Sequence, residues 1–64
     1  MQKFKLITFY NNIKHEFETE TYDEILSAAI DAFNQNHELH EIQKDGELIL
    51  FHCGVYQAIG KAVY

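Results

Sequence analysis

Residues 3–20, KFKLITFYNNIKHEFETE, decide the fold because they predict a β-hairpin whose register can be checked against charge. Two runs that alternate apolar and polar residues flank the pair Asn11-Asn12. Asparagine tolerates the positive φ that a two-residue type I′ turn requires. The stretch therefore predicts two antiparallel strands joined by a tight turn.

This turn fixes which residues lie opposite one another. The expected pairs are Leu6 with Phe17, Tyr10 with Ile13, Lys5 with Glu18, and Lys3 with Glu20. Opposite charges across a strand pair are stabilising, and a one-residue slip would separate both ion pairs and both apolar pairs. One face of the hairpin is then expected to face the core. Its residues are Phe4, Leu6, Thr8, Tyr10, Ile13, Phe17 and Thr19.

An amphipathic helix is predicted over residues 22–36. Thr21 and Glu24 have the spacing of a capping box, in which each residue satisfies an unpaired donor at the start of the helix. Apolar residues then recur at helical spacing, which indicates one buried stripe. They are Tyr22, Ile25, Leu26, Ala29, Ile30 and Phe33.

A second hairpin is predicted from residues 39–44 and 47–53, with its turn at Asp45-Gly46. Its second strand contains LILF, which is apolar on both faces and is typical of a central strand covered on two sides. The tail, 55–64, carries a helical stripe of Val55, Ala58, Ile59, Ala62 and Val63. Its valine, isoleucine and tyrosine residues favour a strand instead, and Gly60 counts against a helix, because glycine costs a helix about 1 kcal/mol relative to alanine. We expect a short C-terminal helix.

These elements predict a small α+β fold with the order ββαββ and a possible final α. An antiparallel sheet would carry one amphipathic helix on one face, and residues 1–64 would form a single compact domain. A chain of this length buries only about 60% of the surface that its unfolded form exposes, so little room is expected for a deep catalytic cleft.

Composition narrows the function classes. The net charge is −5, and the basic residues are five lysines and no arginine, so binding to nucleic acid is not expected. Cys53 is the only cysteine, which excludes an intrachain disulfide. We find no signal-peptide pattern at the N-terminus and no run long enough for a membrane span. We therefore expect a cytoplasmic protein that does not act at a membrane.

The histidines around the second hairpin raise the question of a metal site. His37 and His40 lie three apart, and His52 precedes Cys53, so that four zinc-ligand types fall close together. A two-residue turn would place His40 opposite Phe51 and send His52 to the other face. A three-residue turn with a bulge would pair His40 with Leu50 and put both histidines on one face. In either register Cys53 points away from His52, and we expect incidental histidines with no bound metal or other cofactor.

An enzyme is not expected either. Neighbouring residues of a strand face opposite ways, so His52 is badly placed to act as a base for Cys53. The chain also contains no glycine-rich phosphate loop and no Ser-His-Asp order.

The candidate contact surface is the other face of the first hairpin. Ile7 and Phe9 lie among its charges, where a monomer would prefer polar residues. Either the C-terminal segment covers them or they bind a protein partner or a second copy. Glu16, Glu18 and Glu20 project nearby and form either a solvated face or a surface that imitates DNA or docks on a basic protein. These five residues are the predicted partner-binding set.

The stretch HEFETETYDEILSAA, residues 15–29, resembles the hairpin and capped helix of very short bacteriophage proteins that inhibit host enzymes, among them bacterial RNA polymerase. The resemblance implies a phage or prophage accessory protein. The leading hypothesis is a small non-enzymatic binding module that occludes or adjusts a host protein. A metal-binding or metal-sensing domain using the four candidate ligands is the alternative, and a functional homodimer is a third.

Overall fold

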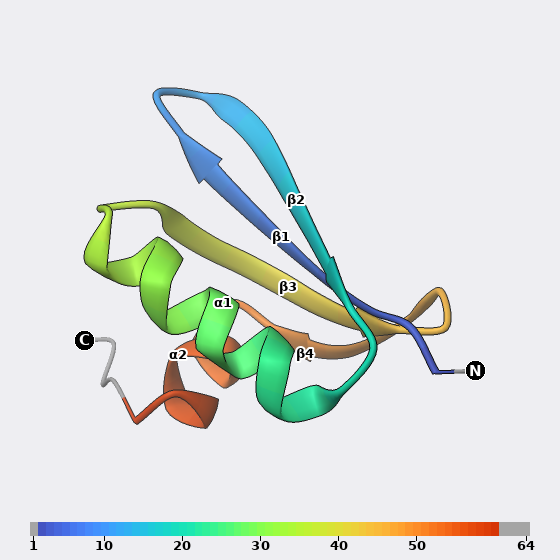
Figure 1. Ribbon diagram of the computed structural model, residues 1–64. Coiled ribbons are helices and arrows are strands. Elements are labelled where there is room, and N and C mark those ends of the chain that lie inside the picture. The colour runs from blue at the N-terminus through green and yellow to red at the C-terminus, as the bar shows by residue number, and fades with distance from the viewer. Residues whose placement is uncertain (1, 61–64) are drawn as a thin grey trace.

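The computed structural model describes residues 2–60 of the chain. Four strands form one antiparallel sheet in the order β2-β1-β3-β4, and two helices complete the fold (Figure 1). The elements are β1 (Phe4–Tyr10), β2 (Ile13–Thr19), α1 (Tyr22–Asn34), β3 (Glu38–Lys44), β4 (Glu47–Phe51) and α2 (Cys53–Ala58). The small α+β fold expected from the sequence is confirmed.

The first hairpin has the predicted turn and register. Asn11 and Asn12 both have positive φ, 53° and 63°, and Leu6 lies opposite Phe17. The ion pairs, however, are not those between directly opposed residues. Lys3 contacts Glu18 and Lys5 contacts Glu16, each at 3.1 Å. The predicted partner of Lys3, Glu20, lies beyond the end of β2, and a long lysine side chain reaches a diagonal neighbour as readily as the residue opposite.

Helix α1 begins and ends with recognisable caps. The Glu24 backbone N–H donates to the Thr21 hydroxyl, as predicted, and that hydroxyl donates in turn to the Glu24 carboxylate at 2.8 Å. The helix ends at Asn34, two residues before the predicted end, and Asn36 takes a left-handed φ of 67°. The Asn36 backbone N–H donates to the Phe33 carbonyl and the His37 N–H donates to the Ala32 carbonyl. These two hydrogen bonds form the pattern of a Schellman cap.

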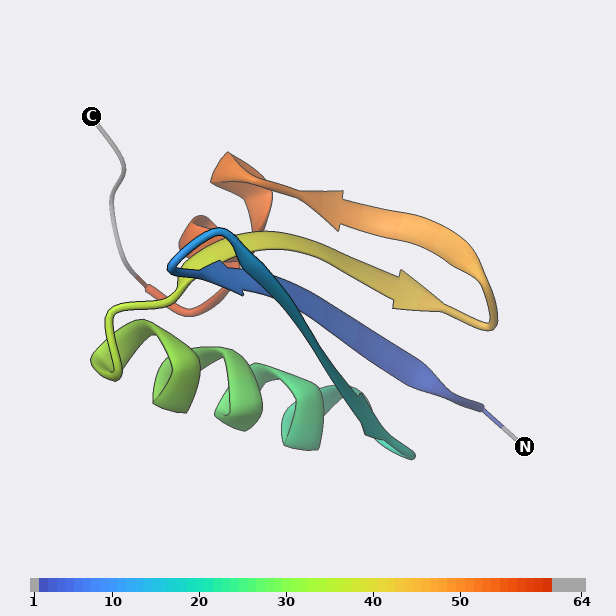
Figure 2. The ribbon, with the colours of Figure 1, turned by 90° about the horizontal axis from the view of Figure 1, so that it is seen from above.

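Both helices contribute to a core on one face of the sheet. Figure 2 shows α1 running along the strands that it covers. The core residues are Phe4, Leu6, Ile25, Ala29, Ala32, Leu39, Ile42 and Val55. Tyr10 and Ile13, which the sequence predicted on the core side, are instead exposed. Figure 1 gives the reason, since the tip of the first hairpin projects away from α1.

The second hairpin departs from both registers considered for it. Its turn has two residues, as expected, with positive φ at Asp45 and Gly46. Each strand nevertheless contains an extra residue: His40 in β3 and Ile49 in β4. As a result Phe51 lies opposite Glu41, and Leu50 lies opposite Ile42.

The expectation that LILF forms a central strand is wrong. Strand β4 is at the edge of the sheet, and Leu48, Ile49 and Phe51 are exposed. Its bulge interrupts the regular pattern of backbone groups along this edge. A bulged edge is a poor template for pairing with another strand.

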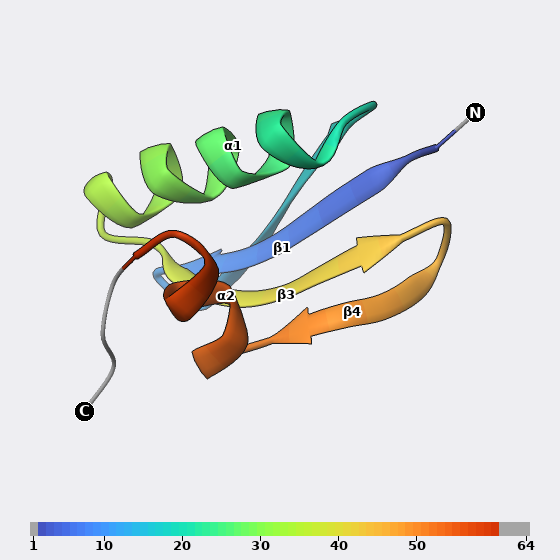
Figure 3. The same cartoon turned by 90° about the horizontal axis from the view of Figure 1, so that it is seen from below.

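Helix α2 covers part of the β3 edge that β4 leaves unpaired. The ladder between β3 and β4 ends at Glu41 and Phe51, so residues 38–40 have no β4 partner. The Leu39 backbone N–H donates to the Tyr56 hydroxyl at 3.0 Å, and the His40 carbonyl accepts from the His52 N–H. Figures 1 and 3 place α2 beside this end of β3.

The predicted C-terminal helix is confirmed over Cys53–Ala58 and ends before Gly60, which has a φ of 78°. Gly54 lies inside α2 and is not its cap, because His52 takes the N-cap position. Ala62 and Val63, which were also assigned to the helical stripe, lie outside the described residues.

Replacing Tyr56 with phenylalanine removes the hydroxyl that satisfies Leu39 while keeping the ring. We expect Tyr56→Phe to lower the free energy of unfolding by about 1–2 kcal/mol, because a half-buried backbone N–H loses its partner. Urea denaturation measures this change. Tyr22→Phe is the matched control, since that ring is exposed and its hydroxyl has no hydrogen bond within the described residues. Equal losses in the two variants would contradict the edge-capping role of Tyr56.

Candidate contact face

The face of the sheet opposite the two helices carries no covering layer from residues 2–60. We call it the open face. Strand register arranges its side chains in rows across the sheet. The rows are Glu18–Lys5–Gln43–Leu48, then Glu16–Ile7–Glu41–Phe51, then Lys14–Phe9–Glu38, with the bulge residue His40 between the second and third.

Ile7 does not form the exposed patch that was considered for it. It is only 5% exposed, and α2 does not cover it, because that helix contacts β3 and β4. Its neighbours on the open face are Glu16 and Glu41 on the flanking strands. The aliphatic stems of long charged side chains can shield an apolar residue while their charged ends remain in water. Phe9 is half-buried.

The accessible apolar surface lies instead at the β4 side of the open face. Leu48 and Phe51 are each 53% exposed. The His40 ring links Phe51 to Phe9: its centroid is 5.2 Å from that of Phe9 and 5.1 Å from that of Phe51, both in edge-on geometry. A row of three rings therefore crosses β1, β3 and β4.

Sequence reasoning missed Leu48, Phe51 and His40 as parts of a surface because it placed LILF inside the sheet. The run LILF could have indicated an exposed apolar surface. A chain with one amphipathic helix and a short tail has too few apolar residues to cover both faces of its last strand, so one face of LILF has to remain exposed.

The negative charge on the open face divides into a paired and an unpaired part. Lys5 lies beside Glu16, and their hydrogen bond and mutual attraction lower the pKa of the Glu16 carboxyl and raise that of the Lys5 ammonium. Glu18 is paired with Lys3. Glu41 has no ion pair within residues 2–60, and Glu38 has only the His52 ring at 3.9 Å.

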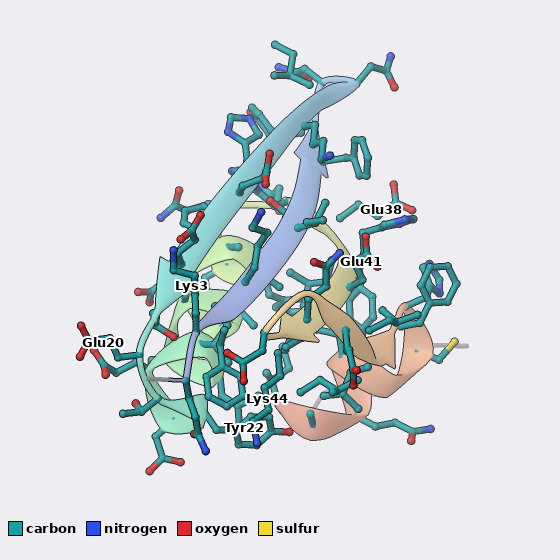
Figure 4. All side chains as sticks on the ribbon, turned by 90° about the vertical axis from the view of Figure 1, so that its right-hand side faces the viewer. Lys3, Glu20, Tyr22, Glu38, Glu41 and Lys44 are labelled. Atoms are coloured by element: carbon teal, nitrogen blue, oxygen red, sulfur yellow. The ribbon has the colours of Figure 1, made fainter. Side chains whose placement is uncertain are left out.

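Figure 4 shows this division in space, with Lys3 and Glu20 on the β1–β2 side and Glu38 and Glu41 on the β3 side. Glu20 lines a shallow pocket of about 360 Å³ together with Gln2, Lys3, Glu18 and Thr19. Among the strand residues of the open face, the carboxylates that have no lysine partner within residues 2–60 are therefore Glu38 and Glu41 on β3, whereas those of β2 are paired.

Lys5→Met should raise the pKa of Glu16 towards its ordinary value, because the variant lacks the hydrogen bond and the nearest positive charge. The Lys5–Glu16 pair stabilises the folded chain at pH values above the ordinary carboxyl pKa. This stabilisation is lost as the pH falls through the lowered pKa of Glu16. NMR titration of the Glu16 carboxyl carbon measures the shift. The control is Lys44→Met, which removes an ammonium group that lies over the Phe4 ring, 5.9 Å from its centroid. An unchanged Glu16 pKa in Lys5→Met would contradict the pairing.

The four residues considered as metal ligands do not gather at one place. His37 lies on the core side, where its ring is stacked on Tyr10 at 5.0 Å and contacts His15 at 4.9 Å. His40 belongs to the open face. In the part of the chain that the structure describes, no group of three or more His, Cys, Asp or Glu side chains is arranged to hold a metal ion.

Cys53 does not point away from His52, contrary to the strand-based expectation. The Cys53 Sγ lies 3.5 Å from the His52 Nδ1. Strand alternation no longer applies there, because His52 leaves β4 with a φ of 46° and Cys53 begins α2. The thiol is exposed and free.

His37 has a structural role instead. The Thr8 side chain is fully buried, and its hydroxyl is hydrogen-bonded to the His37 Nδ1 at 3.0 Å. No buried side-chain nitrogen or oxygen among residues 2–60 lacks a partner. Buried hydroxyls are costly when unpaired, so this bond explains why a polar residue is tolerated beside Leu6 and Leu39.

A double-mutant cycle tests this role. His37→Ala should lower the free energy of unfolding by about 1–3 kcal/mol, because the Thr8 hydroxyl loses its partner. In a Thr8→Val background the same change should cost about 1 kcal/mol less, since no hydroxyl remains to be satisfied. Denaturant melts of the four proteins give the coupling. Additive effects within about 0.5 kcal/mol would rule out the proposed coupling.

Comparisons with known proteins add no family to this description. A scan against protein-family models, a search of curated proteins and a search of solved structures each returned no significant match. Within residues 2–60, neither helix has the length and apolar character needed to cross a bilayer.

Proposed function

We propose that this chain is a small, non-enzymatic, cytoplasmic module that binds a protein partner through the open face and occludes or adjusts that partner. The observation that carries the proposal is the uncovered sheet face with exposed Leu48 and Phe51. An apolar patch bordered by charged residues is typical of protein interfaces, and aromatic side chains are frequent anchors in them.

The arrangement of the face supports a protein partner in particular. Its apolar part is a surface and not a cleft, and the ring row from Phe9 to Phe51 spans three strands. Such a surface offers contact area but no enclosed volume for a small molecule. The net charge of −5 and the absence of arginine argue against nucleic acid as the partner.

The resemblance of residues 15–29 to short phage inhibitors suggests the setting. We propose that the partner is a protein of a bacterial host and that the chain acts as a phage or prophage accessory protein. A module of 64 residues has little room for chemistry of its own, whereas one face of a four-stranded sheet is large enough to block part of a partner's surface.

We propose a centre for this surface that differs from the one expected from the sequence. Ile7 is buried, and Glu16 and Glu18 are paired with lysines, so we place these residues and Glu20 at the border of the contact. Leu48 and Phe51 lie at the centre of the proposed contact, and His40 and Phe9 extend it from β4 across β3 to β1. Substituting Phe9 would disturb a half-buried ring, so Phe51 is the better residue to test.

Quantitative affinity capture from the native host tests the proposal. Phe51→Ser should reduce the amount of captured partner by at least about tenfold, as expected for an interface anchor whose truncation costs about 1.4 kcal/mol or more. Ile13→Ser is the matched control, because Ile13 is an exposed apolar residue, at 59%, outside the open face.

Both variants should unfold at the wild-type denaturant concentration to within a small shift, since both side chains are largely in water. Equal capture by wild type and Phe51→Ser would overturn the open face as the binding surface. Equal loss in both variants would show that general surface apolarity, and not this face, determines capture.

A further inference from the structure

We propose that the partner meets the open face with a basic segment whose arginine lies on the Phe51 ring and pairs with Glu41. This inference rests on the proposed function and specifies the chemistry of the partner. It follows from the placement, on adjacent strands, of one exposed ring and one carboxylate that has no ion pair within residues 2–60.

Register places the two groups within reach of a single side chain. Phe51 on β4 lies directly opposite Glu41 on β3, and directly opposed residues have Cβ atoms about 5 Å apart. A guanidinium group is planar, stacks on aromatic rings and binds carboxylates with two parallel hydrogen bonds. An arginine can therefore contact the Phe51 ring and the Glu41 carboxylate at once.

The charges around Glu41 favour a cation. Glu38 lies on the same face of β3, and its only ionic neighbour within the described residues is His52 at 3.9 Å. Lys5 is held by Glu16 and Lys3 by Glu18, and Lys14, which lies across Phe9 from Glu38, forms no ion pair with Glu38 or Glu41. A basic partner thus meets two carboxylates that no lysine of residues 2–60 pairs with.

The same charges disfavour a second copy as the occupant. A two-fold symmetric contact whose axis passes near Phe51 would bring Glu38 and Glu41 of one protomer towards those of the other. Like charges brought together at an interface are unfavourable, and this chain contains no arginine to relieve them. The bulge at Ile49 also disfavours pairing of β4 with another β4 edge.

The test uses a blocked five-residue peptide, Ala-Arg-Leu-Arg-Ala, titrated into the ¹⁵N-labelled full chain. The control peptide carries citrulline in place of both arginines, which removes the charge and keeps the shape. We expect the arginine peptide to shift the amide signals of His40, Glu41 and Phe51 with saturation in the millimolar range, and the citrulline peptide to leave them unchanged.

Variants assign the contact to the two groups. Glu41→Gln and Phe51→Ser should each weaken peptide binding by about two- to fivefold, the range expected for an exposed ion pair or cation–π contact. Glu20→Gln is the control, because it removes a carboxylate that is more exposed than that of Glu41, has no ion pair within residues 2–60 and lies away from Phe51. It should leave binding unchanged.

Several results would overturn the inference. Equal binding of both peptides would show that charge is not recognised, and equal shifts at Asp23, Glu24 and Asp31 would show attraction to any carboxylate. A dimer in sedimentation that Phe51→Ser abolishes would assign the face to a second copy. If Phe51→Ser loses the native partner but no peptide binds, the proposed function stands and the arginine inference fails.

Discussion

The extra residue at His40 is the feature on which the rest of the structure depends. Leu39 and Ile42 are three residues apart, and in a regular strand they would face opposite sides of the sheet. Both are fully buried in the same core. The bulge resolves this conflict by adding one residue between them, so that Leu39 lies opposite Thr8 and Ile42 lies opposite Leu6.

The consequences of that bulge reach the edge of the sheet and the open face. It turns His40 and Glu41 outward together, which places an imidazole between Phe9 and Phe51 and a carboxylate beside Phe51. The bulge also lies in the part of β3, residues 38–40, that has no partner in β4. Helix α2 covers this part through the Tyr56 hydroxyl, and the backbone of His52 bonds to it as well. One inserted residue therefore reconciles the core side of β3 with its outward surface, at the end of the strand that α2 covers.

The sequence predicted the elements well where local chemistry determines them. Asn11-Asn12, Asp45-Gly46 and the Thr21–Glu24 box each specify a backbone conformation through their own side chains. Both turns and the Thr21 cap occur as expected, while the Glu24 carboxylate accepts from the Thr21 hydroxyl and not from a backbone N–H. Bulges carry no such local signature, because they arise from the demand that distant apolar residues share one core. The faces of β3 and β4, and with them Phe51 and Leu48, could not be assigned from alternation alone.

The charged side chains of the open face oppose the aggregation that an uncovered sheet would otherwise favour. A small domain with a bare apolar face would aggregate, and this chain sets Glu41 between Ile7 and Phe51, with the ion-paired Lys5 on β1. In the proposed complex, the carboxylates that disfavour a second copy are the same groups that would attract a basic partner. Charge would then supply specificity and the rings contact area, which is why the proposal has the two features act together at one face.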